Sequence, residues 1–405
     1  MVPSTTAGEP DGFRQAPVKI QSVMLIAGEA SGDILAVELV KALRAASPSS
    51  VIFFGAGGPK MAEAGVELAF DLTQHSTIGI SWVKKYFELR RLFYQLVRLA
   101  LERKPDVIIG VDYNLFNLRF AEAIKNHIRK QGGQANDWNP KIVKYISPQV
   151  WASRPARAEK LARDFDLLLS IFPFEKDWYA KRVPKLRVEY IGHPIVDRYA
   201  VGAKSTASIE ETGEKAQTLP TIVLLPGSRA GELKRHLPVM LDAAKQISSK
   251  QSVRFTMILP DENLKQLANE VTATLPYFKI RIGGLAETLS QAKLAIASTG
   301  TVTMECAYFG VPTIAIYKMS GITYQIGKRI VRVKYLAMPN LLANEEVFPE
   351  FVQHEATADN ISREAIDVLN SPERRTEIKI KLAEITESLG TPGASERAAK
   401  IILNL

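Results

Sequence analysis

Short apolar runs alternate with amphipathic stretches along this chain, and the whole alternation occurs twice. The runs are rich in Val and Ile and have no polar face, which is typical of strands buried on both sides of a parallel sheet. Because parallel strands need crossover connections, usually helices, each series predicts a doubly wound α/β unit. The expected strands are 23–27, 51–54, 106–111, 142–146, 166–170 and 188–191, then 221–225, 254–259, 279–282, 294–297 and 313–317; the expected helices are 34–45, 82–101 and 118–130, then 237–247, 264–275 and 302–309.

The chain is long enough for two domains of ordinary size. We expect an N-terminal domain over residues 19–200, a C-terminal domain over 220–360, and charged, Ala-rich helices over 361–405 that pack back across the domains. Residues 201–219 lack periodicity and predict a linker or long surface loop, and residues 1–18 predict a disordered tail without the apolar segment of a signal peptide. Ligands bind beyond the carboxyl ends of such strands, so the site is expected in a crevice between the domains.

The formal charge of +9 indicates an anionic partner, which can be nucleic acid, an acidic membrane surface or a phosphorylated substrate. Nucleic acid is disfavoured because the chain has no zinc-finger pattern, no RNP motif and no long basic run. A single cysteine, Cys306, and five scattered histidines argue against a disulfide framework and a metal site. No apolar stretch approaches the roughly 20 residues of a membrane span, so a cytoplasmic protein is expected.

A glycine loop, Leu-Pro-Gly-Ser-Arg over residues 225–229, connects an expected strand to an expected helix. Such a turn presents unpaired backbone N–H groups and the positive end of the helix dipole, and here an arginine lies beside them. Gly227, Ser228 and Arg229 therefore predict binding of a diphosphate.

A second loop of this kind follows the strand at 294–297. Gly300 and Thr301 can hold a phosphate, and Glu305, one turn into the following helix, can accept hydrogen bonds from a ribose diol. Neither loop matches GxxxxGK[ST], and no GxGxxG follows a strand, which disfavours ATP hydrolysis and NAD binding.

Carboxylates follow two strands of the first unit. Glu29 and Asp33 lie in the loop after the first strand, where Asp33 is expected to cap the helix that begins at Ile34, which leaves Glu29 as a site candidate. The strand at 106–111 ends at Asp112, whose carboxylate either accepts a proton from a substrate hydroxyl or caps the following turn.

A basic amphipathic helix is expected from Trp82 to Ala100. Its aromatic residues, Phe87 and Phe93 among them, alternate with Lys and Arg at helical spacing. This pattern fits a helix lying in the headgroup layer of an anionic bilayer, and it equally fits a helix that packs on the core with a solvated basic face.

Several segments resemble, in order and over roughly residues 20–400, the lipid-A-disaccharide synthase family. The combination is far more specific than any single loop. The segments are AGEASGD at 27–33, FGAGGPKM at 54–61, GVD at 110–112, ISPQVWA at 146–152, FPFE at 172–175, GHP at 192–194, LLPGSR at 224–229, Gly300-Thr301 with Glu305, and PNLLA at 339–343.

The resemblance implies a GT-B glycosyltransferase with two Rossmann-like domains facing a central cleft. It implies inverting transfer from UDP-2,3-diacylglucosamine to 2,3-diacylglucosamine 1-phosphate (lipid X), giving UDP and a β-1,6-linked lipid A disaccharide, without a metal or other cofactor. It implies a cytoplasmic protein that is peripheral on the inner face of the inner membrane, and it leaves a homodimer open.

The resemblance also assigns roles to residues. Asp112 would be the general base on the acceptor hydroxyl, and Arg229 would stabilise the leaving diphosphate. The other residues are Gly227, Ser228, Gly300, Thr301 and Glu305 for the donor; Glu29, Ser31 and Asn340 for the acceptor or cleft; and Trp82, Phe87 and Phe93 facing the membrane.

This chain differs from the family's pattern at several positions, including Leu115, Ser153 and Glu345, the last where an arginine is expected. Altered acceptor preference or reduced activity would follow from such changes. Two alternatives therefore accompany the main hypothesis: a related GT-B glycosyltransferase or UDP-sugar epimerase with another acceptor, and a non-catalytic module that binds a UDP-sugar or a membrane.

Overall fold

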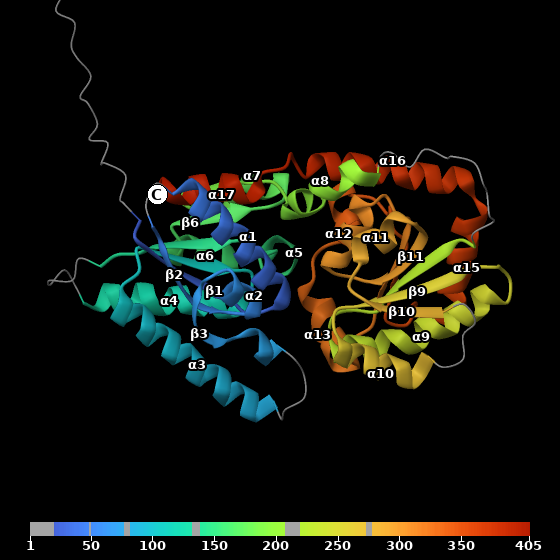
Figure 1. The fold of residues 1–405 in the computed structure, drawn as a ribbon, viewed down its shortest axis with the longest axis horizontal. Helices are drawn as coiled ribbons and strands as arrows, with labels where there is room; N and C mark the ends of the chain where they lie inside the picture. The colour runs from blue at the N-terminus through green and yellow to red at the C-terminus, as the bar shows by residue number, and fades with distance from the viewer. Residues whose placement is uncertain (1–19, 48–49, 77–81, 132–137, 207–218, 273–277) are drawn as a thin grey trace, which may run out of the picture.

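The computed structural model describes residues 20–47, 50–76, 82–131, 138–206, 219–272 and 278–405, and these form two parallel β-sheets. Figure 1 shows the sheets in two separate lobes, each with helices packed around it. The predicted α/β class with two doubly wound units is confirmed.

The N-terminal sheet has the strand order β3-β2-β1-β4-β5-β6-β7. Strand β1 pairs in parallel with β4 from Val23 opposite Val107 to Ala27 opposite Val111, so the loops after both strands emerge at one edge. The strands are β1 (Ser22–Ala27), β2 (Ile52–Gly57), β3 (Glu67–Asp71), β4 (Val107–Val111), β5 (Lys141–Tyr145), β6 (Leu167–Ser170) and β7 (Val188–Tyr190).

The C-terminal sheet repeats this arrangement with the order β10-β9-β8-β11-β12-β13. Strands β8 and β11 therefore occupy the places that β1 and β4 have in the first sheet. The strands are β8 (Thr221–Leu225), β9 (Arg254–Leu259), β10 (Phe278–Ile282), β11 (Ala292–Ser298), β12 (Thr313–Tyr317) and β13 (Glu350–Val352).

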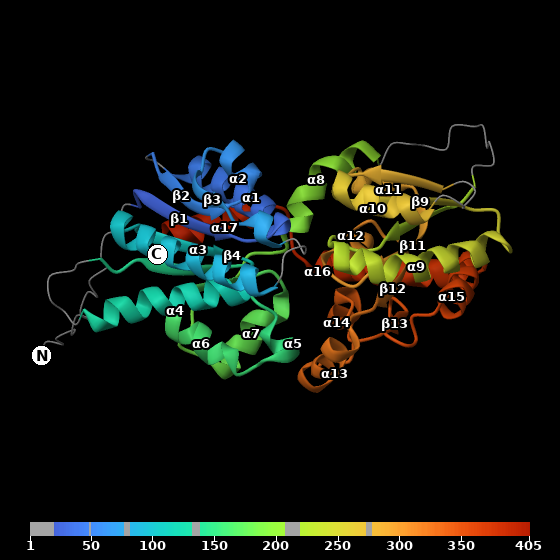
Figure 2. The same ribbon diagram turned by 90° about the horizontal axis from the view of Figure 1, so that it is seen from below.

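The C-terminal helices connect the two lobes. Figures 1 and 2 show α16 beside the second lobe and α17 returning to the first, where it packs against α1 and α8. A 3₁₀ turn spans Thr73–Ser76. The helices are α1 (Ala30–Ala46), α2 (Pro59–Glu63), α3 (Trp82–Arg103), α4 (Asn114–Lys130), α5 (Val150–Ser153), α6 (Arg157–Asp164), α7 (Pro173–Arg182), α8 (Pro194–Thr206), α9 (Ala230–Ser248), α10 (Glu262–Thr272), α11 (Leu285–Ser290), α12 (Thr301–Tyr308), α13 (Gly321–Ile330), α14 (Met338–Ala343), α15 (Ala358–Asn370), α16 (Pro372–Ser388) and α17 (Ala394–Leu403).

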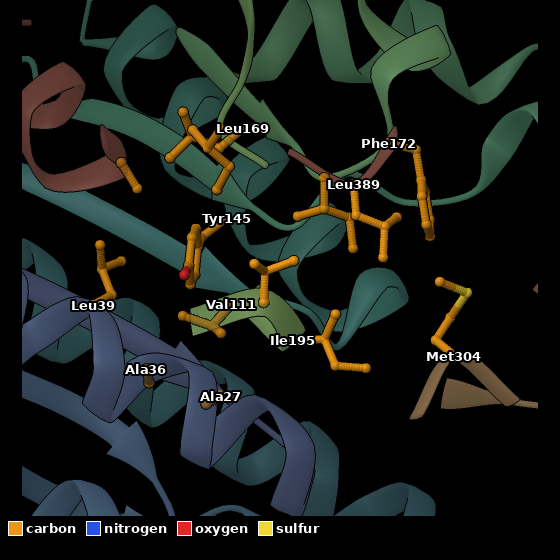
Figure 3. Packing of buried hydrophobic residues seen from close by; sticks show 14 of the residues in the cluster. Ala27, Ala36, Leu39, Val111, Tyr145, Leu169, Phe172, Ile195, Met304 and Leu389 are labelled. Atoms are coloured by element: carbon orange, nitrogen blue, oxygen red, sulfur yellow. The ribbon is translucent and has the colours of Figure 1, made fainter. Parts of the chain in front are cut away.

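One hydrophobic cluster extends from the first sheet into the second lobe. Tyr145 of β5 is fully buried in it, and Figure 3 shows Leu389, just after α16, and Phe172 among the members of the same cluster. Met304 of α12 belongs to the same cluster. Because burial of apolar area is the main favourable term in folding, this shared cluster holds the two lobes together.

The structure extends or corrects the predicted elements in several places. Helix α8 runs to Thr206, so the first six residues of the predicted linker are helical, and residues 207–218 of it lie outside the described part of the chain. The predicted tail at 1–18 also lies outside it. The short strands β3 and β13 were missed; both lie at sheet edges, where half-exposed residues lack the continuous apolar pattern.

Candidate active site

The β8–α9 loop places Arg229 at the N-cap position of α9. Gly227 has a φ of 118°, and a Cβ there would lie 2.8 Å from the Cβ of Glu232, so this position requires glycine. The Ser228 N–H donates to Glu232 Oε2 at 3.2 Å, and Arg229 Nη1 lies 3.5 Å from Glu232 Oε1. The loop therefore already binds an anionic group, the carboxylate of its own helix.

The β1–α1 loop lies against Arg229. Glu29 occupies the N-cap position of α1, and its Oε2 accepts a hydrogen bond from Arg229 Nη2 at 2.9 Å. Ser31 is half-exposed in the first turn of α1. The structure thus brings together Glu29, predicted for the acceptor side, and Arg229, predicted for the donor side.

Contrary to the prediction, Asp33 does not cap its own helix. Helix α1 begins at Ala30, so Asp33 lies inside it and is buried. Its carboxylate accepts hydrogen bonds from the backbone N–H groups of Gly58, Lys60 and Met61 at 2.9–3.1 Å, and so caps α2 instead. Glu29, not Asp33, is the N-cap residue of α1.

Asp112 lies directly after β4 with a φ of 42°, in the left-handed region. Its N–H donates to the Tyr145 carbonyl at 3.1 Å, and its own carbonyl accepts from Asn117 Nδ2 at 2.8 Å and from Lys144 Nζ. Its carboxylate is half-buried and accepts no hydrogen bond from any residue that the structure describes. The backbone is therefore fixed while the carboxylate stays available, which suits a general base.

A fully buried lysine, Lys144 of β5, supports this strand end. Burial lowers its pKa to about 8, and the negative charge of Asp112 acts in the opposite direction. The Tyr113 ring covers the neighbouring loop so closely that a Cβ on Gly28 would lie 2.2 Å from it. Lys144 and Tyr113 are functional candidates that sequence reasoning missed, since neither has a motif of its own.

The second glycine loop is open, but Glu305 faces another element. Gly300 has a φ of 149°, and a Cβ there would meet no atom within 4 Å. Glu305 Oε1 accepts a hydrogen bond from the Tyr199 hydroxyl of α8 at 2.8 Å and lies 3.9 Å from Arg198 Nη1. Burial raises the pKa of Glu305. Thr301 is exposed beside Gly300, so the loop itself is accessible to a ligand.

The Pro339–Ala343 segment forms most of α14, and hydrogen bonds of a buried side chain within it fix its position. Asn340 is fully buried; its Nδ2 donates to the Phe348 carbonyl at 2.7 Å, and its Oδ1 accepts from the Val347 N–H at 2.9 Å. Contact with a ligand would require Asn340 to exchange these bonds. Glu345, which replaces an expected arginine, accepts from Lys381 Nζ of α16 at 2.7 Å.

His236 is a buried residue that the sequence did not single out. Its Nδ1 lies 2.8 Å from the Pro226 carbonyl of the β8–α9 loop, and its Nε2 accepts from the Lys318 N–H at 3.0 Å. Accepting at Nε2 requires an unprotonated nitrogen there, so the ring is neutral and Nδ1 is the donor. Burial lowers the pKa of His236.

Helix α3 combines a core face with an exposed basic and aromatic face. Phe93 packs edge-on against Phe116 and Phe120, whereas Phe87 is 61% exposed and Tyr94 is 58% exposed. The side chain of Trp82 lies outside the described residues. None of the helices in the described residues is long and apolar enough to cross a membrane, and the same residues hold no cluster of three or more metal-ligating side chains.

Comparison with known proteins identifies close sequence relatives over nearly the whole chain. The family model described as Lipid-A-disaccharide synthetase matches residues 23–404. The lipid-A-disaccharide synthase of Geobacter metallireducens is 36% identical over 95% of this chain and 97% of its own length. That of Myxococcus xanthus is 35% identical with the same coverage of both chains.

Solved structures with low identity share the fold. The UDP-GlcNAc 2-epimerase of Neisseria meningitidis, bound to UDP-GlcNAc, matches with a TM-score of 0.63 at 11% identity, over 95% of this chain and 100% of that one. Acinetobacter baumannii MurG matches with a TM-score of 0.54 at 14% identity, over 95% and 100% of the two chains. These likenesses show the GT-B fold expected from the sequence.

Proposed function

The chain belongs to the lipid-A-disaccharide synthase family, and on that basis we propose that it transfers a diacylglucosaminyl group from UDP-2,3-diacylglucosamine to 2,3-diacylglucosamine 1-phosphate. The products are UDP and a β-1,6-linked lipid A disaccharide 1-phosphate. The observation that carries the proposal is the Glu29–Arg229 contact, because it brings the expected acceptor and donor loops to one place in the cleft.

In the proposed reaction the acceptor's 6-hydroxyl oxygen attacks the anomeric carbon of the donor. Asp112 takes the hydroxyl proton, a bond forms between the acceptor oxygen and the anomeric carbon, and the bond from that carbon to the diphosphate breaks. The electron pair leaves on the diphosphate, where Arg229 and the N–H groups of the Gly227 and Gly300 loops stabilise the negative charge. A single displacement of this kind inverts the anomeric configuration and needs one base.

The proposal includes docking on the anionic inner face of the inner membrane. Both substrates carry acyl chains, so the enzyme has to work at a lipid surface. The exposed face of α3, with Phe87, Tyr94 and the arginines Arg90, Arg91 and Arg98, has the chemistry to bind there. Glu29, Ser31 and Asn340 remain predictions for the acceptor side.

The substitution Asp112→Asn tests the base. It keeps the size of the side chain and removes its basicity, so kcat should fall by about 10²–10⁴-fold with little change in either KM. UDP release and disaccharide formation are measured on the purified, folded protein. Asp177→Asn, on the exposed side of α7, is the matched control and should leave kcat unchanged. An unchanged kcat in Asp112→Asn would remove Asp112 from the mechanism.

A further inference from the structure

A cavity of about 350 Å³ lies between the two domains, apart from the loops of Arg229 and Gly300. One wall is the Pro148–Arg157 segment with the start of α4, and the other is the segment from Val331 to Leu341. The two walls touch where the Arg332 N–H donates to the Ala152 carbonyl at 2.9 Å. The cavity is therefore formed by both domains together.

The N-terminal wall is held in place by buried hydrogen bonds. Trp151 Nε1 donates to Glu175 Oε1 at 3.0 Å, and the Tyr179 hydroxyl donates to the Pro148 carbonyl at 3.1 Å. Glu175 and Tyr179 are both fully buried. Such support fixes the shape of the wall before a ligand arrives, which lowers the entropic cost of binding.

The lining of the cavity combines apolar side chains with two cationic ones. Leu118, Val331 and Val333 are among its apolar residues, while Arg154 and Arg157 line it without any carboxylate among the lining residues. Neither arginine forms an ion pair with the residues that the structure describes. Burial and the guanidinium groups of Arg154 and Arg119 lower the pKa of Arg157, which reflects positive charge without a counter-ion.

An unpartnered polar atom belongs to a lining residue that is close to Asp112 in sequence. Asn114 lines the cavity two residues after Asp112, and its Oδ1 is buried without a hydrogen-bond partner among the described residues. Buried acceptors of this kind are rarely left unpaired in native proteins. A ligand hydroxyl in the cavity would supply the missing donor.

We propose that this cavity is the acceptor subsite, in which Arg154 and Arg157 bind the phosphate of the phosphorylated sugar. The apolar lining residues contact the first carbons of its acyl chains. This inference rests on the proposed function. Asn114 Oδ1 accepts a hydrogen bond from a sugar hydroxyl and holds the ring beside Asp112. The volume lies at the low end for ligand sites, so the remaining length of the acyl chains lies outside.

The test compares two acceptors, 2,3-diacylglucosamine with and without its 1-phosphate. Arg154→Ala and Arg157→Ala should each raise KM for the phosphorylated acceptor by about 10-fold or more, while KM for the unphosphorylated acceptor and for the donor stays within about twofold. Lys160→Ala, which removes an exposed cation from the same helix as Arg157, should change neither. Ser153→Trp, which fills part of the cavity, should raise KM for both acceptors.

Three results in the arginine variants would overturn this assignment. The first is an unchanged KM for the phosphorylated acceptor in both variants, and the second is an equal rise in KM for the two acceptors. The third is weaker UDP binding by calorimetry, which would make the cavity part of the donor site. Wild-type protein that forms no disaccharide from either acceptor would refute the proposed function instead. In that case the affinity for the phosphorylated acceptor is measured without donor. Weaker binding to Arg157→Ala than to wild type would still support the subsite, and equal binding would contradict it.

Discussion

The β1–α1 loop and the β8–α9 loop end in N-cap residues of the same backbone conformation but opposite charge. Glu29 and Arg229 are the N-cap residues of α1 and α9, with φ/ψ values of −136°/157° and −129°/142°, and each follows the third strand in the order of its sheet. Their side chains meet across the cleft at 2.9 Å. The fold therefore supplies two similar helix N-termini, one with a carboxylate and the other with a guanidinium at its N-cap.

A bound diphosphate can replace the carboxylates that pair with Arg229. Its guanidinium contacts Glu29 and Glu232, and the Arg229 and Glu29 side chains are 45% and 33% exposed. Exposed ion pairs are worth roughly 0–1 kcal/mol, so a diphosphate with more charge and more acceptor oxygens can displace them. The contact brings the domains together without blocking the site.

The largest effect expected from this comparison is a difference in kcat/KM between variants of the two N-cap residues. Arg229→Ala should lower kcat/KM by about 10²–10³-fold, because it removes the cation that we propose stabilises the leaving diphosphate. Glu29→Gln should change it by less than about 10-fold, since it removes only a weak ion pair. UDP release is measured for both, with Lys234→Ala, at an exposed position near the start of α9, as the control. Equal losses in the two variants would show that the pair acts as a unit.

Sequence reasoning located the strands and loops because they depend on local patterns. The apolar runs at 23–27 and 221–225 match β1 and β8 to within one residue, and the loops that follow them lie at one cleft. It failed where a side chain bonds to a distant segment. Asp33 was expected to cap its own helix but caps α2, 25 residues away. No local spacing encodes such contacts.

The second comparison concerns the crossover before the fourth strand of each unit. In the first unit it is α3, with 22 residues, and in the second it is α11, with six. The extra length of α3 is therefore not required by the topology. If its exposed face binds lipid, Phe87→Ser should lower affinity for anionic vesicles by about 10-fold without destabilising the fold, because Phe87 is exposed.

Vesicle co-sedimentation measures this effect. Ile380→Ser, which removes a comparably exposed apolar residue from α16, is the control and should leave sedimentation unchanged. Phe93→Ala should reduce thermal stability instead, since Phe93 packs on Phe116 and Phe120. Unchanged vesicle binding in Phe87→Ser would favour a purely structural role for α3.

The smallest expected effect concerns how each loop is held. In the first unit, Asp33 of α1 forms hydrogen bonds to the N-terminus of α2. In the second unit, His236 of α9 forms hydrogen bonds to the Pro226 carbonyl and the Lys318 N–H. Burial lowers the pKa of His236 in the folded state, so below about pH 6.5 the unfolded chain binds a proton that the native chain does not. Stability contributed by neutral His236 is therefore complete above that pH and is lost as the pH falls.

The loss from one such group is at most about 1.4 kcal/mol per pH unit, so it should appear as a modest fall in the unfolding midpoint between pH 7 and 5.5. His236→Gln should lower the midpoint at pH 7, because the Lys318 N–H loses its acceptor geometry, yet show a smaller further fall at pH 5.5. His354→Gln, at an exposed position, is the control. The same pH dependence in His236→Gln and wild type would mean that groups other than His236 set the acid sensitivity.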